Sequence, residues 1–145
     1  MKILPWALGI MGILIFCMGC KAPEIGLTPT GLHPCPDRPN CVSSQGATDE
    51  QILLPLGYST DRATACAKIK QIVQSQENAT IVAETTNYLH VEFRSKVMGF
   101  VDDMEFWFPE DQPVIHLRSA SRLGYSDFGV NRKRVQHIRT LFEKH

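Results

Sequence analysis

The stretch GFVDDMEFWFPEDQPVIHLRSAS, residues 99–121, decides the fold because apolar and polar residues alternate along it. Its two halves, 100–108 and 114–119, are rich in aromatic and β-branched residues, which favour strands. The segment between them, 109–113, holds two prolines and two acids and has the composition of a turn. We therefore predict a β-hairpin.

Working outward, the chain predicts a second hairpin before the first and a helix on each side of the pair. Residues 79–86 and 88–94 are β-rich runs separated by one asparagine. The segments 61–76 and 131–142 carry apolar residues at helical spacing. An apolar run with an internal proline, 52–58, favours an edge strand.

This order of elements predicts an α+β domain. We expect a small antiparallel β-sheet, with about four to five strands, and two α-helices packed on one of its faces. Side chains of a strand point to alternate faces, so the pattern also assigns residues to faces. The face away from the helices collects these side chains: Tyr88, His90, Glu92, Arg94, Asp103, Glu105, Trp107, His116 and Arg118.

We expect that polar face to be open to solvent, with cross-strand ion pairs such as Glu105 with Arg118. The alternative is a concave charged surface on which Trp107 and Tyr88 are aromatic platforms for a ligand. Asp102 and Asp103 are adjacent and should therefore point to opposite faces.

The N-terminus has the form of an export signal. A single lysine precedes an uncharged apolar run, 3–16, and small residues lead to Cys20. This spacing resembles a lipoprotein signal, in which Cys20 carries lipid; an uncleaved anchor and an ordinary secreted form are the alternatives. We therefore expect residues 1–19 to be a signal peptide or anchor, and the protein to be exported and membrane-anchored in a bacterial cell envelope.

Residues 20–34 contain several prolines and glycines and are expected to form a tether before a single globular domain, 35–145. Cys35 and Cys41 lie six positions apart in a proline-rich turn, which favours a local disulfide in an exported protein. Free thiols and a metal or redox pair are the alternatives. We expect no metal and no cofactor.

Net charge narrows the range of partners. The 15 basic and 15 acidic residues cancel, whereas a protein that wraps nucleic acid has an excess of basic residues. We therefore expect no nucleic-acid partner. The membrane, a small anionic molecule or an envelope protein remain as partners.

Two groups of residues are candidates for a site. Asp103 and Glu105 share a face, with His116 on the next strand, and two nearby carboxylates can support general acid/base chemistry. Neutralisation of these carboxylates by arginine is the simpler account.

The second group surrounds the turn that leads into the last helix. Arginines and the free N–H groups of a helix start can bind an anion, and the candidate ligands are Arg118, Arg122, Asn131, Arg132 and Arg134. In the alternative, these arginines bond Asp102, Asp127 and loop carbonyls, and the backbone freedom of Gly124 and Gly129 shapes the turn.

Three motifs carry a family resemblance: CPDRPNCVSS at 35–44, GFVDDMEF at 99–106 and RSASRLGYSDFGVNRKRVQHIR at 118–139. The chain resembles the bacterial and plastid family catalogued as domain of unknown function 1499. That resemblance implies an envelope location, because bacterial members often carry lipoprotein or membrane leaders. It implies no activity and no catalytic residue.

Two functions therefore remain open. The first is a non-catalytic envelope domain that binds an anionic ligand or a protein partner. The second is a hydrolase or lyase that acts on envelope material through the carboxylate pair.

Overall fold

The computed structural model describes residues 23–144 of the 145-residue chain. The expected signal or anchor, 1–19, and the expected lipidation site Cys20 lie outside the described residues. None of the helices within 23–144 is long and apolar enough to span a bilayer.

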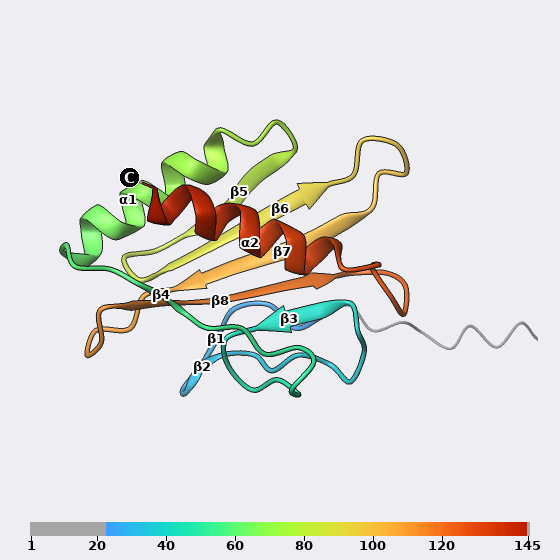
Figure 1. Ribbon diagram of the computed structural model, residues 1–145, viewed down its shortest axis with the longest axis horizontal. Helices are drawn as coiled ribbons and strands as arrows, with labels where there is room; N and C mark the ends of the chain where they lie inside the picture. The colour runs from blue at the N-terminus through green and yellow to red at the C-terminus, as the bar shows by residue number, and fades with distance from the viewer. Residues whose placement is uncertain (1–22, 145) are drawn as a thin grey trace, which may run out of the picture.

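A six-stranded antiparallel sheet forms the centre of the molecule (Figure 1). Its main path runs β3-β8-β7-β6-β5, and β4 pairs with the first residues of β8. The strands are β3 (Cys41–Ser43), β4 (Leu56–Gly57), β5 (Ala79–Glu84), β6 (Tyr88–Arg94), β7 (Val101–Trp107) and β8 (Val114–Ser121). A separate two-stranded hairpin consists of β1 (Leu27–Thr28) and β2 (Gly31–Leu32).

Both helices lie on one face of this sheet (Figure 1). They are α1 (Arg62–Gln74) and α2 (Val130–Glu143). The N-terminus of α1 is capped by Asp61, whose side chain accepts a hydrogen bond of 2.9 Å from the Thr64 N–H. Beneath the helices is one apolar core, to which the strands contribute Leu89, Val91, Phe93, Met104, Phe106, Ile115 and Leu117, and the helices contribute Ile69, Val73, Val135 and Ile138. The predicted α+β class is confirmed.

The other face of the sheet is covered by the N-terminal segment, residues 24–34, which includes the β1–β2 hairpin. We call this segment the N-terminal cover. It is hydrogen-bonded to the polar side chains of the sheet: the Gly26 N–H donates to Glu105, and the Glu24 carbonyl accepts from Arg118. Residues that the sequence assigns to a tether therefore pack on the sheet.

The expectation that the polar face is open to solvent is wrong at the centre of that face, although Arg94 at its edge is exposed. Glu105 has no exposed surface, and Asp103 and Arg118 are each 1 % exposed. The alternation of side chains correctly places these residues on one face, but the strands carry no information about which other segment packs on that face.

Candidate anion-binding cleft

A buried ion pair occupies the centre of the polar face. Arg118 on β8 donates from Nη1 to Oε2 of Glu105 on β7 at 2.6 Å, as the strand register predicts for these directly opposite residues. The other carboxylate oxygen of Glu105 accepts from the Tyr88 hydroxyl at 2.7 Å and from the Gly26 N–H at 2.8 Å. Burial and the hydrogen bond to Glu105 hold the pKa of Tyr88 above its ordinary value.

A second charged cluster surrounds Asp103, which lies on β7 two residues before Glu105. Asp103 accepts hydrogen bonds from the Nε and Nη2 atoms of Arg122, at 2.8 and 2.7 Å, and lies 2.7 Å from Nε2 of His90. Arg122 also pairs with Glu92. Burial on its own raises the pKa of the Asp103 carboxyl, but the hydrogen bonds from Arg122 and His90 outweigh burial, so the net pKa lies below the ordinary value.

The three candidate catalytic residues are thus held in separate contacts. Glu105 is paired with Arg118, and Asp103 with Arg122. His116 stacks on the Trp107 ring at 5.3 Å, its Nδ1 lies 3.1 Å from the Ser44 hydroxyl, and burial lowers its pKa. Both carboxylates are already neutralised by arginine, which matches the simpler account drawn from the sequence.

The residues predicted around the β8–α2 turn also bond within the protein. Asn131 is fully buried and bonds Ser119, and Arg134 pairs with Asp102 at 2.7 Å. Asp102 and Asp103 therefore do point to opposite faces. Arg132 donates to the Glu50 carbonyl.

At the start of α2, a side chain of the turn itself bonds two of the N–H groups. Asp127 accepts from the Gly129 N–H at 3.0 Å and from the Asn131 N–H at 2.7 Å. Gly124 and Gly129 both have positive φ, 87° and 77°, which is the backbone freedom that the sequence assigns to them. The cleft beside this turn, about 240 Å³, is lined by Arg38 and Arg132 together with three acids, Asp37, Glu50 and Asp127, so carboxylates outnumber its cations.

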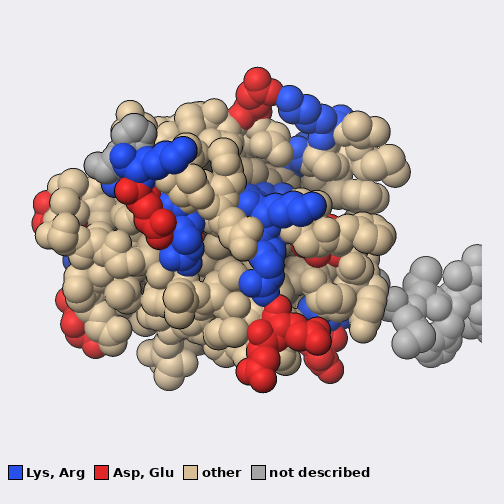
Figure 2. Space-filling model, in the orientation of Figure 1, with Lys and Arg blue, Asp and Glu red and all other residues tan. Residues whose placement is uncertain are grey.

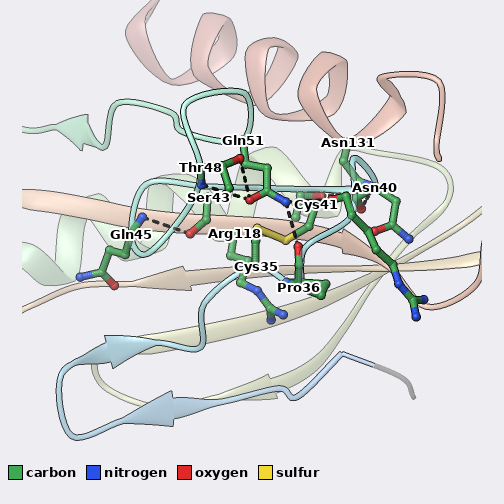
Figure 3. Close-up of a disulfide and its surroundings, with 12 residues drawn as sticks. Cys35, Pro36, Asn40, Cys41, Ser43, Gln45, Thr48, Gln51, Arg118 and Asn131 are labelled. Atoms are coloured by element: carbon green, nitrogen blue, oxygen red, sulfur yellow. Dashed lines mark hydrogen bonds between the residues drawn. A yellow bond between two sulfur atoms is a disulfide. The ribbon is translucent and has the colours of Figure 1, made fainter. Parts of the chain in front are cut away.

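A different set of residues forms a cleft beside the disulfide. Cys35 and Cys41 are bonded, with sulfurs 2.06 Å apart, and close a short loop (Figure 3). The buried amide of Gln51 holds this loop by donating to the Pro36 and Arg38 carbonyls, both at 2.8 Å. The cleft lies between this loop, the N-terminal cover and the end of β8, and its volume is about 290 Å³.

Arg118 lines this cleft, and part of its hydrogen-bonding capacity is unused. Figure 3 shows its side chain beside the Cys35–Cys41 disulfide. Only Nη1 of its guanidinium bonds other described residues, and Nε is buried without a partner. The Nε–Nη2 edge is the fork that binds a carboxylate or phosphate through two hydrogen bonds, and Arg122 uses that same edge to bind Asp103. The equivalent edge of Arg118 meets no acidic side chain among residues 23–144.

Further polar groups line the same cleft. Asn40 is buried, and while its Nδ2 donates to the Gly124 carbonyl at 2.7 Å, its Oδ1 has no partner in the protein. The guanidinium of Arg38 makes no hydrogen bond or ion pair with residues of the described chain. His33 lies 3.4 Å from the carboxylate of Glu24 at the rim.

Reasoning from sequence missed most of this cleft. Arg38 and Asn40 lie in the CPDRPNC motif, whose sequence favours a disulfide turn and by itself indicates no anion site. A signal was present, because a short loop closed by a disulfide has little interior, so a charged residue within it must point outward. Among the described residues, no group of three or more His, Cys, Asp or Glu side chains could hold a metal ion.

Fold and cleft together define a class of protein: a small antiparallel sheet covered by two helices on one face and by the chain's own N-terminal segment on the other. The chain belongs to the family described as protein of unknown function (DUF1499), whose model matches residues 31–142. Comparison with curated proteins and with solved structures finds no match.

Proposed function

We propose that this protein is a non-catalytic, membrane-anchored domain of the bacterial cell envelope that binds a small anionic ligand in the cleft beside the disulfide. The observation that carries the proposal is the unused Nε–Nη2 edge of Arg118. A buried donor without a partner costs about 1–3 kcal/mol, so a ligand that satisfies it gains that free energy on binding. Arg38 adds a second cation at the same cleft.

The chemistry of the cleft specifies the ligand further. Arg118 and Arg38 supply donors for a phosphate or carboxylate, while the Oδ1 atom of Asn40 accepts a hydrogen bond. The ligand that fits is therefore an anion that also carries a hydroxyl or amide donor. A phosphomonoester of a small polyol has both features, whereas inorganic phosphate at neutral pH offers the anion with a single weak donor.

The envelope location is supported by two features of the sequence and one of the structure. The apolar run 3–16 and the small residues before Cys20 favour an anchored exported protein. The Cys35–Cys41 disulfide is typical of a compartment outside the cytoplasm. Mass spectrometry of the N-terminal peptide from bacterial membranes would decide whether lipid is attached to Cys20.

Titration calorimetry of the full chain in a non-ionic detergent tests ligand binding. The probes are inorganic phosphate and glycerol 3-phosphate, compared with chloride at equal ionic strength because salt screens exposed charges. We expect glycerol 3-phosphate to bind more tightly than phosphate. Arg38→Ala should weaken binding about tenfold or more, because a hydrogen bond to a charged group is lost.

Lys133→Ala is the matched control. Lys133 is exposed on α2, outside the cleft, and its ammonium group, like the guanidinium of Arg38, makes no hydrogen bond or ion pair within the described chain. The control should bind glycerol 3-phosphate as the unchanged protein does. Equal binding by Arg38→Ala and Lys133→Ala, or no heat from either probe, would contradict the proposal and would mean that ordered water satisfies Arg118 and Asn40.

The carboxylate pair offers less support for the hydrolase alternative. Asp103 and Glu105 each accept a hydrogen bond from an arginine and have at most 1 % of their surface exposed. A general base must reach the proton that it removes, and these two are screened by the N-terminal cover.

A further inference from the structure

Two loops at one end of the sheet expose most of the large apolar side chains found on the surface of the described chain. They are the β6–β7 loop and the β8–α2 turn, which lie at the right-hand end in Figure 1. Together they expose Val97 at 92 %, Met98 at 67 %, Phe100 at 51 %, Leu123 at 61 %, Tyr125 at 71 %, Phe128 at 89 % and Val130 at 46 %. We call these seven residues the apolar end. The same end is mostly tan in Figure 2, the colour of uncharged residues.

The two loops form one continuous surface. A groove of about 410 Å³ runs between them, with Phe100 and Val101 on one side and Leu123 and Phe128 on the other. The Arg122 N–H donates to the Val101 carbonyl at 3.2 Å and ties the loops together. Contiguous exposed apolar surface of this kind marks a site of contact with a protein or a membrane.

The β8–α2 turn is held in place although its apolar side chains point outward. Asp127 bonds the backbone on its C-terminal side, and Asn40 bonds the Gly124 carbonyl. Phe128 is the non-glycine residue with positive φ, 54°, among those described. The turn therefore presents a fixed aromatic side chain to the surroundings instead of folding it into the core.

The position of the first described residues, Pro23 and Glu24, indicates what the apolar end faces. Pro23 and Glu24 line the same cleft as Ser121 and Arg122, immediately before Leu123. Cys20 is three residues from Pro23, a reach of at most about 11 Å for an extended chain. The last residue of the apolar run, Phe16, is seven residues away, at most about 25 Å. An anchor in either form would hold this end of the sheet within a short distance of the lipid headgroups.

We propose that the apolar end is a membrane-contact surface that inserts into the interface of the bilayer in which the N-terminus is anchored. Aromatic and aliphatic side chains on a rigid turn are suited to the boundary between headgroups and acyl chains. This inference shares with the proposed function only the N-terminal anchor, and it does not depend on the anion-binding cleft.

Tryptophan quenching by brominated lipid tests this contact in the full chain. Both variants also carry Trp6→Phe, and Phe128→Trp is compared with Leu54→Trp. Trp107 is retained in both and contributes the same fluorescence to each. Leu54 is a matched control because it is 78 % exposed and lies by the last turns of α2, where Arg139 bonds its carbonyl, away from the apolar end. Each protein is reconstituted into phosphatidylethanolamine/phosphatidylglycerol vesicles with or without dibrominated chains.

We expect the residue introduced at position 128 to lose several times more fluorescence in brominated vesicles than the one introduced at position 54. Leu123→Trp should repeat the result from a second position. Equal quenching at positions 128 and 54 would overturn the membrane-contact surface. So would a blue-shifted, concentration-dependent emission at position 128 without quenching, because that result indicates contact with a second copy of the chain.

Flotation of the same vesicles separates this inference from the anchor on which it rests. A chain that floats with the vesicles but shows no quenching at position 128 is anchored without using the apolar end. A chain that does not float with the vesicles overturns both the anchor and the membrane-contact surface, and leaves the calorimetric test of the cleft unaffected.

Discussion

The centres of the two faces of the sheet are both closed to water, but by different means. On one face, Leu89, Met104 and Phe106 are fully buried beneath apolar side chains of the helices. On the other, Glu105 and Arg118 are buried beneath the N-terminal cover, which supplies peptide N–H and C=O groups. Helices cannot supply these groups from their middle turns, because their backbone is already hydrogen-bonded.

This difference shows that the two faces of an amphipathic sheet need different kinds of partner when they are buried. Apolar surface gains free energy from burial against any apolar partner of suitable shape. A charged residue loses free energy on burial unless each of its donors and acceptors is paired. The polar face therefore depends on particular partners, and it should respond to substitution more sharply than the apolar face.

Substitution of neighbouring residues on β7 should show the largest difference. Glu105→Leu leaves Arg118 buried without its counter-charge, and we expect it to lower the free energy of unfolding by about 3–5 kcal/mol. Met104→Leu, on the apolar face, should cost less than about 1.5 kcal/mol because it conserves volume. Urea denaturation of the full chain in detergent measures both values.

The double variant Glu105→Leu/Arg118→Met checks the reason for that loss. Removal of both charges should restore most of the stability, since a buried ion pair is often replaceable by apolar residues of similar volume. A double variant as unstable as Glu105→Leu alone would show that shape, and not the unpaired charge, dominates the polar face.

The N-terminal cover should be sensitive to a single methyl group. A Cβ at Gly31 would lie 2.4 Å from the Gln45 side-chain oxygen and 2.7 Å from the Trp107 ring, at a φ of 127°. Gly31→Ala should therefore cost about 1–3 kcal/mol of stability. At Gly57 a Cβ would meet no atom within 4 Å, so Gly57→Ala should change stability by less than about 0.5 kcal/mol. Equal effects in thermal unfolding would mean that the cover is not packed as described.

A smaller effect should be a pH dependence of the stability that comes from His116 on the polar face. Burial lowers the pKa of His116, so below about pH 6.5 the unfolded chain binds a proton that the folded chain does not. Stability should consequently fall as the pH is lowered from 7 towards 5. His116→Asn should reduce that slope, whereas His137→Asn, at an exposed position on α2, should leave it unchanged. Urea titrations at pH 7, 6 and 5 measure the slope.

The ionisation of Asp103 also makes the stability fall as the pH is lowered, but in a lower pH range. Its pKa lies below the ordinary value, so its contribution to stability is complete above about pH 4 and is lost as the pH falls further. The two windows are separate, so Asp103 adds little to the slope between pH 7 and 5.

The sequence predicted those parts of the fold that have a regular period. Alternation along 100–108 and 114–119 located β7 and β8, and helical spacing located α1 and α2. Strand β3 was not predicted, because three residues are too few to show a period and its partner is distant in the chain: Cys41 pairs with Ala120. The N-terminal cover was missed for a related reason, since its contacts use backbone groups that every sequence has.

Of the ligand residues that the sequence predicts, Arg118 and Arg122 line the candidate cleft, and Arg122 is already bonded to Asp103. The alternation along β8 correctly predicts that Arg118 lies on the face away from the helices and pairs with Glu105, so the grouping of Arg118 with Arg132 and Arg134 at the start of α2 is wrong. Asn40 and the disulfide loop, which are the actual neighbours of Arg118, lie some 80 positions earlier. Only the pairing of β3 with β8 brings them together, and no periodic pattern in the sequence predicts that pairing.

The bond between Glu24 and Arg118 also has a mechanical consequence. Among the described residues, tension applied to the N-terminal end of the chain would first meet the sheet at the 2.9 Å hydrogen bond between the Glu24 carbonyl and Arg118. A pull would therefore peel the N-terminal cover from the sheet one bond at a time, beginning at the wall of the cleft. The strands and the helix-covered core would carry load only after the cleft had opened.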